Sequence, residues 1–127
     1  MPKILVAEDT QDTREMFKWL LEQEGYQVIV AEDGKQALDL ASQNPPDLLL
    51  TDLMMPVKSG VELIKDIRSS GGSLAMIPII AISAYGLEEL HQAMVAGASV
   101  ILRKPNDLDS ITDTVRNLLR RRGSHSN

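Results

Sequence analysis

Polar side chains that could together bind a metal ion and a phosphate follow four short apolar segments of this chain. Glu8 and Asp9 follow one segment, and Asp52, Ser83 and Lys104 each follow another. Neighbouring carboxylates repel each other unless a cation is present, and Mg²⁺ prefers oxygen ligands of this kind. A lysine is a compact positive charge suited to a phosphoryl oxygen. The set predicts a site for phosphoryl chemistry, with Asp52 as the nucleophile, because carboxylates form acyl phosphates.

Each of these residues, taken alone, also has an ordinary structural explanation. Acids ahead of a helix, such as Glu8 and Asp9, often cap it. A single aspartate at the end of a strand, such as Asp52, is more often a turn residue. Ser83 and Lys104 alone indicate almost nothing. The hypothesis therefore depends on the combination, in which several strand ends supply complementary groups.

The apolar segments alternate with segments of helical period. Runs of successive apolar residues are typical of strands covered on both faces, and this alternation favours a parallel sheet with right-handed crossovers. We expect an α/β fold, a doubly wound (βα)₅ flavodoxin-like three-layer sandwich with sheet order 2-1-3-4-5. In that order the site residues meet at the carboxyl ends of the strands. The expected strands lie at residues 4–7, 28–30, 48–50, 79–82 and 100–102.

Helix boundaries follow from local signals. The first helix is expected from about Thr10 to Gly25, a residue suited to left-handed termination, and the second after Asp33. Residues 59–62 (Ser-Gly-Val-Glu) fit a capping box at the start of the third. The fourth is expected at about 87–97 and the fifth at about 107–121.

Composition restricts the class of protein. The chain has 127 residues, 43% of them hydrophobic, a net charge of −5 and no cysteine. It has no apolar run of membrane-spanning length and no signal-peptide layout, and its negative charge disfavours direct nucleic-acid binding. We expect a cytoplasmic protein with one domain over residues 1–121. Residues 122–127 are expected to be a disordered tail, of a composition typical of vector-derived residues.

The segment Asp52-Leu53-Met54-Met55-Pro56, followed by Gly60, is the strongest motif of the chain. Together with Glu8-Asp9, Ser83-Ala84, Gly97-Ala98 and Lys104-Pro105, it resembles the receiver domains of two-component response regulators over about residues 3–121. The likeness is to the stand-alone, chemotaxis-regulator type. It implies that Asp52 takes a phosphoryl group from a phosphohistidine of a sensor histidine kinase or a histidine phosphotransfer protein. Phosphorylation would then switch a surface that an unknown downstream protein reads.

The resemblance also assigns the remaining site residues. Asp9 and Asp52 would bind Mg²⁺ with the backbone carbonyl of Met54, and Glu8 would act through water. Lys104 would hold a phosphoryl oxygen, Ser83 would be the switch hydroxyl, and the N–H of Ala84 would assist it. Lys104 precedes Pro105, and the family usually has a cis peptide bond between these two residues.

Two surface positions bear on partners. Where many receivers carry a tyrosine or phenylalanine that swings inward on activation, this chain has Ile101, which has no ring and is stiff at χ1. A homodimer through the face around Ile101 stays an open alternative. Trp19 lies off the core face of the first helix, where the family's kinases often dock, so it is a candidate docking residue. The other explanation is an edge packing residue.

Other functions are less well supported by the residues. A Mg²⁺-dependent phosphatase or mutase with an aspartate nucleophile usually needs a second acid two residues later, where this chain has Met54. A flavin carrier would share the fold class, but residues 8–10 (Glu-Asp-Thr) are a poor cradle for a phosphate. A purely docking domain need not retain Asp9, Asp52 or Lys104, and all are present. We expect a signalling phospho-acceptor and not an enzyme.

Overall fold

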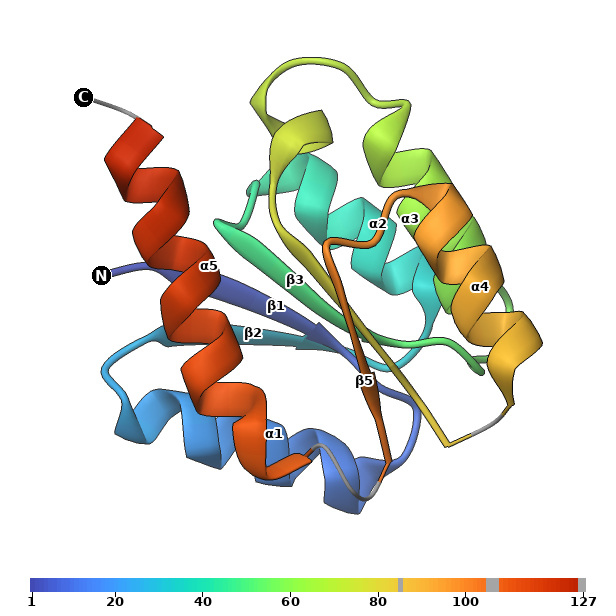
Figure 1. Ribbon diagram of the computed structural model, residues 1–127, viewed down its shortest axis with the longest axis horizontal. Helices are drawn as coiled ribbons and strands as arrows, with labels where there is room; N and C mark the ends of the chain where they lie inside the picture. Colours follow the sequence, from blue (N-terminus) through green and yellow to red (C-terminus); the bar gives the residue numbers. More distant parts are fainter. Residues whose placement is uncertain (85, 105–107, 126–127) are drawn as a thin grey trace.

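The fold is a five-stranded parallel sheet between two layers of helices. The computed structural model describes residues 1–84, 86–104 and 108–125. The sheet order is β2-β1-β3-β4-β5, which confirms the expected doubly wound arrangement (Figure 1). The strands are β1 (Lys3–Ala7), β2 (Gln27–Ala31), β3 (Leu48–Asp52), β4 (Ile79–Ser83) and β5 (Val100–Arg103).

Each face of the sheet is covered by its own set of helices (Figure 1). One face packs against α1 (Gln11–Gln23) and α5 (Ile111–His125), with Phe17 and Val115 among the buried side chains. The other packs against α2 (Gly34–Gln43), α3 (Gly60–Arg68) and α4 (Leu87–Ala96), with Ile64 and Ala93 among the buried ones. Neighbouring strand residues contribute to opposite clusters because their side chains alternate between faces. This double coverage explains the uninterrupted apolar runs of the strands.

Most of the expected helix ends are confirmed. Gly25 has a φ of 92° and follows α1, as expected for a left-handed terminator. Asp33 caps α2 by accepting a hydrogen bond from the N–H of Gln36, at 2.7 Å. Ser59 accepts one from the N–H of Glu62, at 3.2 Å, which is the first half of the expected capping box. Side chains that satisfy these donors keep α2 and α3 from fraying next to the site.

The last helix differs from the prediction at both ends. A 3₁₀ turn, η2 (Leu108–Ser110), precedes α5, which begins at Ile111 and continues to His125. Residues 122–125, expected as a disordered tail, are therefore helical, and 126–127 lie outside the described residues. Arg120 and Arg121 favour continuation, because cations near a helix C-terminus interact well with its dipole. A second 3₁₀ turn, η1 (Ser73–Met76), was not predicted.

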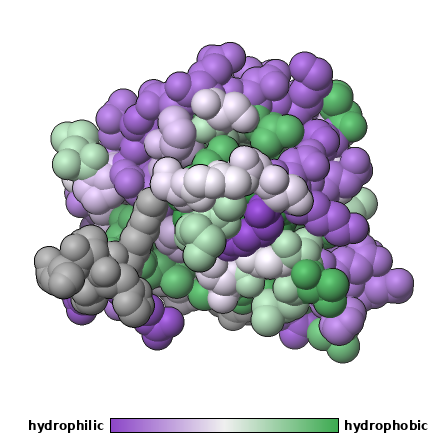
Figure 2. Space-filling view, turned by 90° about the horizontal axis from the view of Figure 1, so that it is seen from above, coloured by the Kyte–Doolittle hydropathy of each residue, from purple (hydrophilic) through white to green (hydrophobic). Residues whose placement is uncertain are grey.

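The surface away from the carboxyl ends of the strands mixes residue types. Seen from above, hydrophilic residues are most frequent around the edge and hydrophobic ones lie between them (Figure 2). Of the large hydrophobic side chains that are exposed, three belong to α4: Leu87, Met94 and Val95. Across the part of the chain that the structure describes, no helix is both long and apolar enough to span a lipid bilayer.

The loop from β3 to α3 contains a strained residue. Val57 has a φ of 68°, and it is the one non-glycine residue in the described ranges with a positive φ. The N–H of Lys58 donates to the carbonyl of Pro56 at 2.7 Å, which closes a γ-turn around Val57. The carbonyl of Lys58 in turn accepts from the N–H of Gly34 at 3.1 Å, so the loop is fixed to the start of α2. A β-branched residue in this region carries a real conformational cost.

Replacing Val57 with glycine should therefore stabilise the protein. Glycine adopts positive φ without the steric cost of about 1–2 kcal/mol, but it loses part of the gain through its freer unfolded state. The free energy of unfolding in urea should rise by roughly 0.5–1 kcal/mol. Val95→Gly is the control, because Val95 is as exposed but helical. That change should lower stability by about 0.5 kcal/mol, and a loss at both positions would contradict strain at Val57.

Candidate functional site

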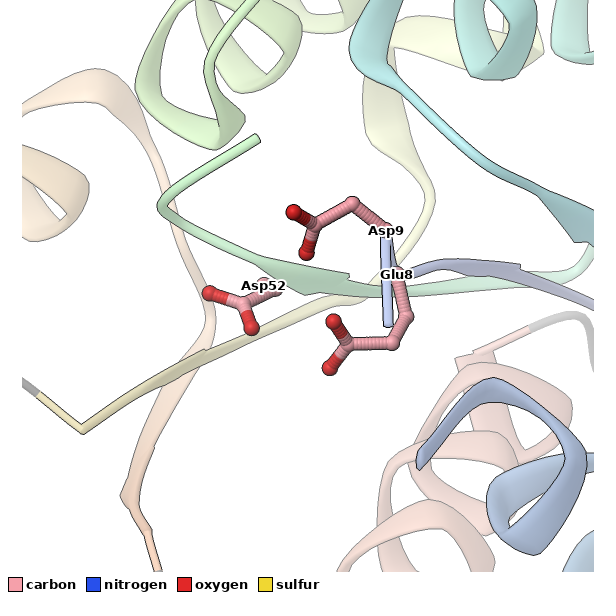
Figure 3. Close-up of side chains that lie close together, drawn as sticks. All are labelled: Glu8, Asp9 and Asp52. Atoms are coloured by element: carbon pink, nitrogen blue, oxygen red, sulfur yellow. The ribbon is translucent and has the colours of Figure 1, made fainter. Parts of the chain in front are cut away.

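Three carboxylates converge where β1 and β3 end. Glu8 and Asp9 directly follow β1, and Asp52 is the last residue of β3. Ala7 pairs with Thr51, so the chains leave the two neighbouring strands at the same level. One carboxylate oxygen from each acid lies within 4.8 Å of the others, and the side chains point toward one another (Figure 3). The convergence predicted from the parallel topology is confirmed.

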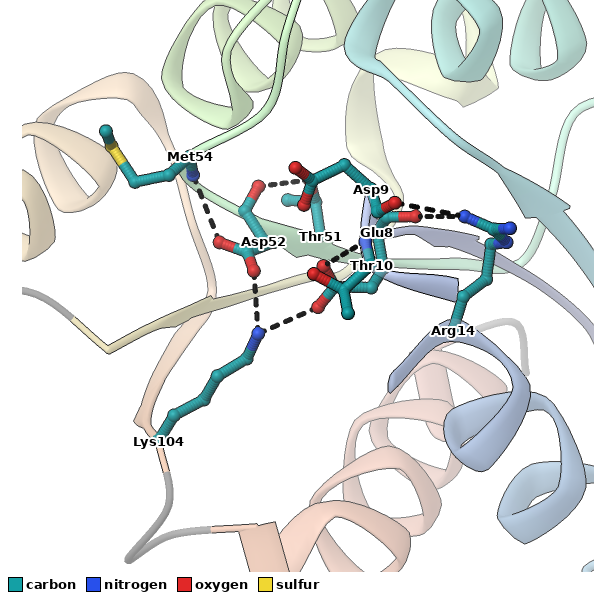
Figure 4. A network of polar contacts seen from close by, with 8 residues as sticks. All are labelled: Glu8, Asp9, Thr10, Arg14, Thr51, Asp52, Met54 and Lys104. Carbon is teal, nitrogen blue, oxygen red and sulfur yellow. Dashed lines mark hydrogen bonds and ion pairs between the residues drawn. The ribbon is translucent and has the colours of Figure 1, made fainter. Parts of the chain in front are cut away.

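Lys104 brings a positive charge into the same cluster. It directly follows β5, and its Nζ donates to Oε1 of Glu8 at 2.8 Å and to Oδ2 of Asp52 at 2.7 Å (Figure 4). Its backbone N–H donates to the carbonyl of Ser83 at 2.9 Å, which ties the end of β5 to the end of β4. The lysine side chain is 19% exposed, so it reaches the carboxylates from a largely covered position. Lys104 meets Glu8 and Asp52, although they are far apart in the sequence, because parallel strands end at the same edge of the sheet.

Burial and neighbouring charges shift the pKa values of Glu8 and Lys104 in this cluster. Glu8 is fully buried, and burial, reinforced by the charge of Asp52, raises its pKa from 4.5 to about 7, against the hydrogen bonds from Lys104 and the N–H of Thr10. Burial works against the ammonium of Lys104, but its hydrogen bonds to Asp52 and Glu8 outweigh that effect and raise its pKa. Near neutral pH, Glu8 can therefore lose its proton when a divalent cation binds beside it.

Asp52 is held by donors on both oxygens. The N–H of Met54 donates to Oδ1 at 3.0 Å, while Lys104 occupies Oδ2. The side chain is 10% exposed, which leaves one edge open to an incoming group. Gly60 allows the backbone of Asp52 to pass close to the start of α3, because a Cβ at position 60 would lie 2.2 Å from the carbonyl oxygen of Asp52. A residue with a side chain at position 60 would force the nucleophile's own backbone to move.

The donor set fits a hard divalent cation. Carboxylate and carbonyl oxygens are the ligands of Mg²⁺, and the cluster contains no sulfur or imidazole ligand in the part of the chain that is described. Asp9 is exposed and Asp52 nearly covered, so an ion bound by both carboxylates could keep water ligands on its solvent side. The role of the Met54 carbonyl stays a prediction, although its N–H already contacts Asp52.

The other predicted residues lie around this cluster or elsewhere. Ser83 is buried at the end of β4, one residue past Ile82, the strand partner of Asp52, and Ala84 follows it at the surface. Ile101 is half-buried against the α4 side of the core. Trp19 is 60% exposed on α1, as its position on the helix predicts. Pro105 and its peptide bond lie outside the described residues.

Sequence reasoning missed Arg14 and Thr10. Arg14, on α1, donates to the backbone carbonyls of Glu8 and Asp9, and the N–H of Thr10 donates to Oε2 of Glu8 at 3.2 Å (Figure 4). The available signal was an arginine placed early in a helix that directly follows two acids. It is weak, because most arginines in such positions face solvent.

Comparisons with known proteins agree with this geometry. A family described as "Response regulator receiver domain" matches residues 4–116. Response regulator MprA of Mycobacterium sp. (strain KMS) is 38% identical over 120 residues, 94% of this chain and 51% of that protein. Transcriptional regulatory protein CpxR of Escherichia coli (strain K12) is 39% identical over 122 residues, 95% of this chain and 50% of that protein. The chain thus spans about half the length of the curated relatives it matches.

A solved structure shows the same likeness in three dimensions. The receiver domain of a Francisella response regulator superposes with a TM-score of 0.86 at 33% identity, over 95% of this chain and 98% of that one. The family match covers most of the chain, and the acidic cluster with its lysine lies at the expected edge of the expected sheet. This chain therefore belongs to the response regulator receiver domain family of two-component signal transduction.

Proposed function

We propose that Asp52 accepts a phosphoryl group in a Mg²⁺-dependent reaction. The observation that carries the proposal is the pairing of Asp52 with Lys104 at 2.7 Å beside two further carboxylates. Asp9, Asp52 and the Met54 carbonyl would hold the ion, and Glu8 would act through water. When bound, the ion would offset the negative charge of the phosphoryl oxygens. The phosphoryl donor would be the phosphohistidine of a histidine kinase or phosphotransfer protein.

The residues of the chain divide the chemistry among themselves. A carboxylate oxygen of Asp52 attacks phosphorus, an O–P bond forms, the P–N bond of the phosphohistidine breaks, and the imidazole leaves with the electron pair. Lys104 is placed to donate a hydrogen bond to a phosphoryl oxygen on Asp52, because its Nζ already contacts that carboxylate. Preorganised positive charge of this kind stabilises the charge spread over a transferring phosphoryl group. The same carboxylate later releases the group to water, so the domain acts as a phospho-acceptor and not as an enzyme.

Phosphorylation would change the hydrogen bonds at the ends of β4 and β5. The hydroxyl of Ser83, the last residue of β4, and the N–H of Ala84, which begins the connection to α4, would be donors for the new oxygens. Movement there would alter the surface that a downstream protein recognises. Ile101 has no ring to rotate, so we propose that the change passes through the backbone after β4. The alternative hypothesis of a phosphatase needs a second acid two residues after Asp52, and Met54 occupies that position.

Acetyl phosphate tests the proposal without a kinase. Incubation of the chain with acetyl phosphate and Mg²⁺, followed by intact mass measurement, should show a gain of about 80 Da, the mass of one phosphoryl group on a carboxylate. Chelation of Mg²⁺ with EDTA should suppress the gain. Absence of any gain with acetyl phosphate and with a panel of phosphorylated histidine phosphotransfer domains would overturn the proposed function.

The raised pKa of Glu8 predicts a pH-dependent affinity for Mg²⁺. The fold raises this pKa from 4.5 to about 7, so Glu8 favours folding when protonated, and this contribution is complete below about pH 4.5 and lost as the pH rises through about 7. Without Mg²⁺, the stability of Glu8→Gln relative to the unmodified chain should therefore rise between pH 5.5 and 8. Mg²⁺ should bind the unmodified chain more tightly over the same range, because the ion displaces a proton.

Two measurements check this expectation. Urea unfolding at pH 5.5 and 8 gives the stability difference, and calorimetric titration with MgCl₂ gives the affinity. Glu32→Gln is the matched control, since its carboxylate also follows a strand but is 69% exposed. Its stability relative to the unmodified chain should not change with pH, and its Mg²⁺ affinity should keep the pH dependence that Glu8→Gln loses. Equal pH dependence in the two variants would show that Glu8 is not the titrating group.

The exposed Trp19 is expected to contribute to binding of the kinase. Its ring is 60% exposed, and Met16 on the same helix is 40% exposed, so α1 presents apolar surface that a partner could cover. With a histidine kinase that phosphorylates the chain, Trp19→Ala should weaken binding about 10-fold or more, which is typical of an aromatic hot spot. Phosphorylation by acetyl phosphate should not change. Met94→Ala, which removes a 53% exposed side chain of α4, is the control, and an equal loss there would contradict docking on α1.

A further inference from the structure

Arg14 connects the first helix to the backbone of the acidic pair. Its Nη1 donates to the carbonyl of Glu8 at 3.0 Å and also lies 3.4 Å from the carbonyl of Asp9 (Figure 4). Its side chain is 12% exposed, so most of it is covered although it lies on a surface helix. A charged group is seldom covered to this extent unless its hydrogen bonds are well formed. The geometry therefore calls for a role beyond solubility.

The acidic pair needs such support because it lies where regular structure ends. The N–H of Glu8 still joins the sheet by donating to the carbonyl of Ala31 at 3.0 Å, but β1 ends at Ala7 and α1 begins only at Gln11. The carbonyls of the connecting residues thus fall between a strand ladder and a helix. Arg14 supplies donors to two of them and fixes the direction in which the Glu8 and Asp9 side chains leave the backbone. Both bonds come from Nη1, so one nitrogen of the guanidinium holds the two neighbouring carbonyls.

The remaining contact of Arg14 is secondary. Its Nη2 lies 3.5 Å from Oε1 of Glu32, whose side chain is 69% exposed. Exposed ion pairs of this length contribute little. A hollow of about 390 Å³ on the same side of the molecule is lined by Arg14, Glu15, Lys18, Val30, Glu32 and Gln36. The guanidinium thus lies between this open hollow and the backbone of the acidic pair, and its hydrogen bonds to carbonyls are the contacts made on the covered side.

We propose that Arg14 is a positioning residue for Mg²⁺, which holds the turn at Glu8 and Asp9 so that their carboxylates are oriented toward the ion before it binds. The inference rests on the proposed function and deepens it. Arg14 makes no contact with the carboxylates themselves among the described interactions, so it acts through the backbone of the residues that carry them. Groups that orient metal ligands in this way typically change metal affinity 10–100-fold when they are removed.

Arg14→Met tests the inference, because methionine keeps the covered aliphatic stem and loses the donors. Calorimetric titration with MgCl₂ should give an affinity about 10-fold weaker than that of the unmodified chain. The rate of phosphorylation by acetyl phosphate should fall at low Mg²⁺ and recover to within about twofold at saturating Mg²⁺, since the chemical groups remain. Arg14→Lys, which keeps the charge and donors on a shorter side chain, should lie between Arg14→Met and the unmodified chain.

Two controls separate positioning from general damage. Lys18→Met removes a cation from the same hollow, and Arg116→Met removes an arginine that pairs with Glu24 and Asp113; neither should change Mg²⁺ affinity. Unchanged Mg²⁺ affinity in Arg14→Met, with or without a lower urea midpoint, would overturn the inference and leave the proposed function standing. Failure of the unmodified chain to bind Mg²⁺ would instead overturn both.

Discussion

Replacement of Asp52 with asparagine is expected to abolish phosphoryl incorporation, with at least a 100-fold loss in rate from acetyl phosphate. The amide keeps the size of the side chain and can still accept from the N–H of Met54, but it is no longer a nucleophile that forms an acyl phosphate. It also removes a negative charge from the cluster that includes Glu8. Since the charge of Asp52 helps to raise the pKa of Glu8, that pKa should fall in the variant.

Intact mass and hydroxylamine sensitivity measure the first effect. The unmodified chain should gain one phosphoryl group that hydroxylamine removes, as it does acyl phosphates, and Asp52→Asn should gain none. Asp47→Asn is the matched control, because Asp47 directly precedes β3 and accepts from the N–H of Lys3 at 2.7 Å, far from the carboxyl end of the strand. Retention of the full mass gain in Asp52→Asn would mean that another carboxylate, with Asp9 the first candidate, is the acceptor.

The fold was predictable because the sheet is covered on both faces. The apolar run Leu48–Leu50 contributes alternately to both core clusters, so every residue of the run is buried and the strand needs no polar alternation. Helix ends marked by residues with special backbone or side-chain chemistry, such as Gly25 and Asp33, were predictable for the same local reasons. The end of α5 was not, since nothing in the sequence after Arg121 distinguishes a fraying helix from a short tail.

The site was predictable as a set of strand ends but not as a network. Parallel topology alone brings Glu8, Asp52 and Lys104 to one edge, and residue type alone suggests a cation and a phosphate. That Lys104 bridges two carboxylates follows from side-chain reach and burial, which appear only in three dimensions. The strain at Val57 was also hidden, because valine is among the least expected residues at positive φ.

Arg14 shows where sequence reasoning ends. Its role depends on two backbone carbonyls, and a backbone carbonyl has no signature in the sequence. The resemblance to the family assigns chemistry to side chains, and it leaves open how the turn between β1 and α1 is held.

Lys104→Met should have the second large effect, and its direction should depend on the ion. The substitution leaves fully buried Glu8 and nearly covered Asp52 without their shared cation. Removing one partner of a buried ion pair costs several kcal/mol, and since Lys104 is partly exposed we expect a loss of about 2–3 kcal/mol in EDTA at pH 8. The loss should be smaller at pH 6, because the hydrogen bond from Lys104 lowers the pKa of Glu8 and its removal favours the protonated, uncharged acid.

The same variant should bind Mg²⁺ more tightly and use it less well. Without Lys104 the carboxylates no longer share their charge with an ammonium, so the ion should bind about 10-fold more tightly and restore much of the lost stability. Phosphorylation at saturating Mg²⁺ should nevertheless be about 100-fold slower, because the group placed to stabilise the phosphoryl oxygens is gone. The affinity and the rate would then change in opposite directions, which general unfolding cannot produce.

Urea unfolding at pH 6 and 8, with EDTA or with MgCl₂, measures the stability terms, and calorimetry with acetyl phosphate kinetics measures the others. Lys58→Met is the matched control, since Lys58 is a partly covered lysine paired with one carboxylate, Asp66, whose side chain is 40% exposed. Its loss should cost less than about 1 kcal/mol and show no dependence on Mg²⁺. If Lys104→Met behaved like Lys58→Met, the bridge between Glu8 and Asp52 would be an ordinary surface ion pair. The lysine could then not be the group that first balances the site's charge and later holds the phosphoryl oxygen.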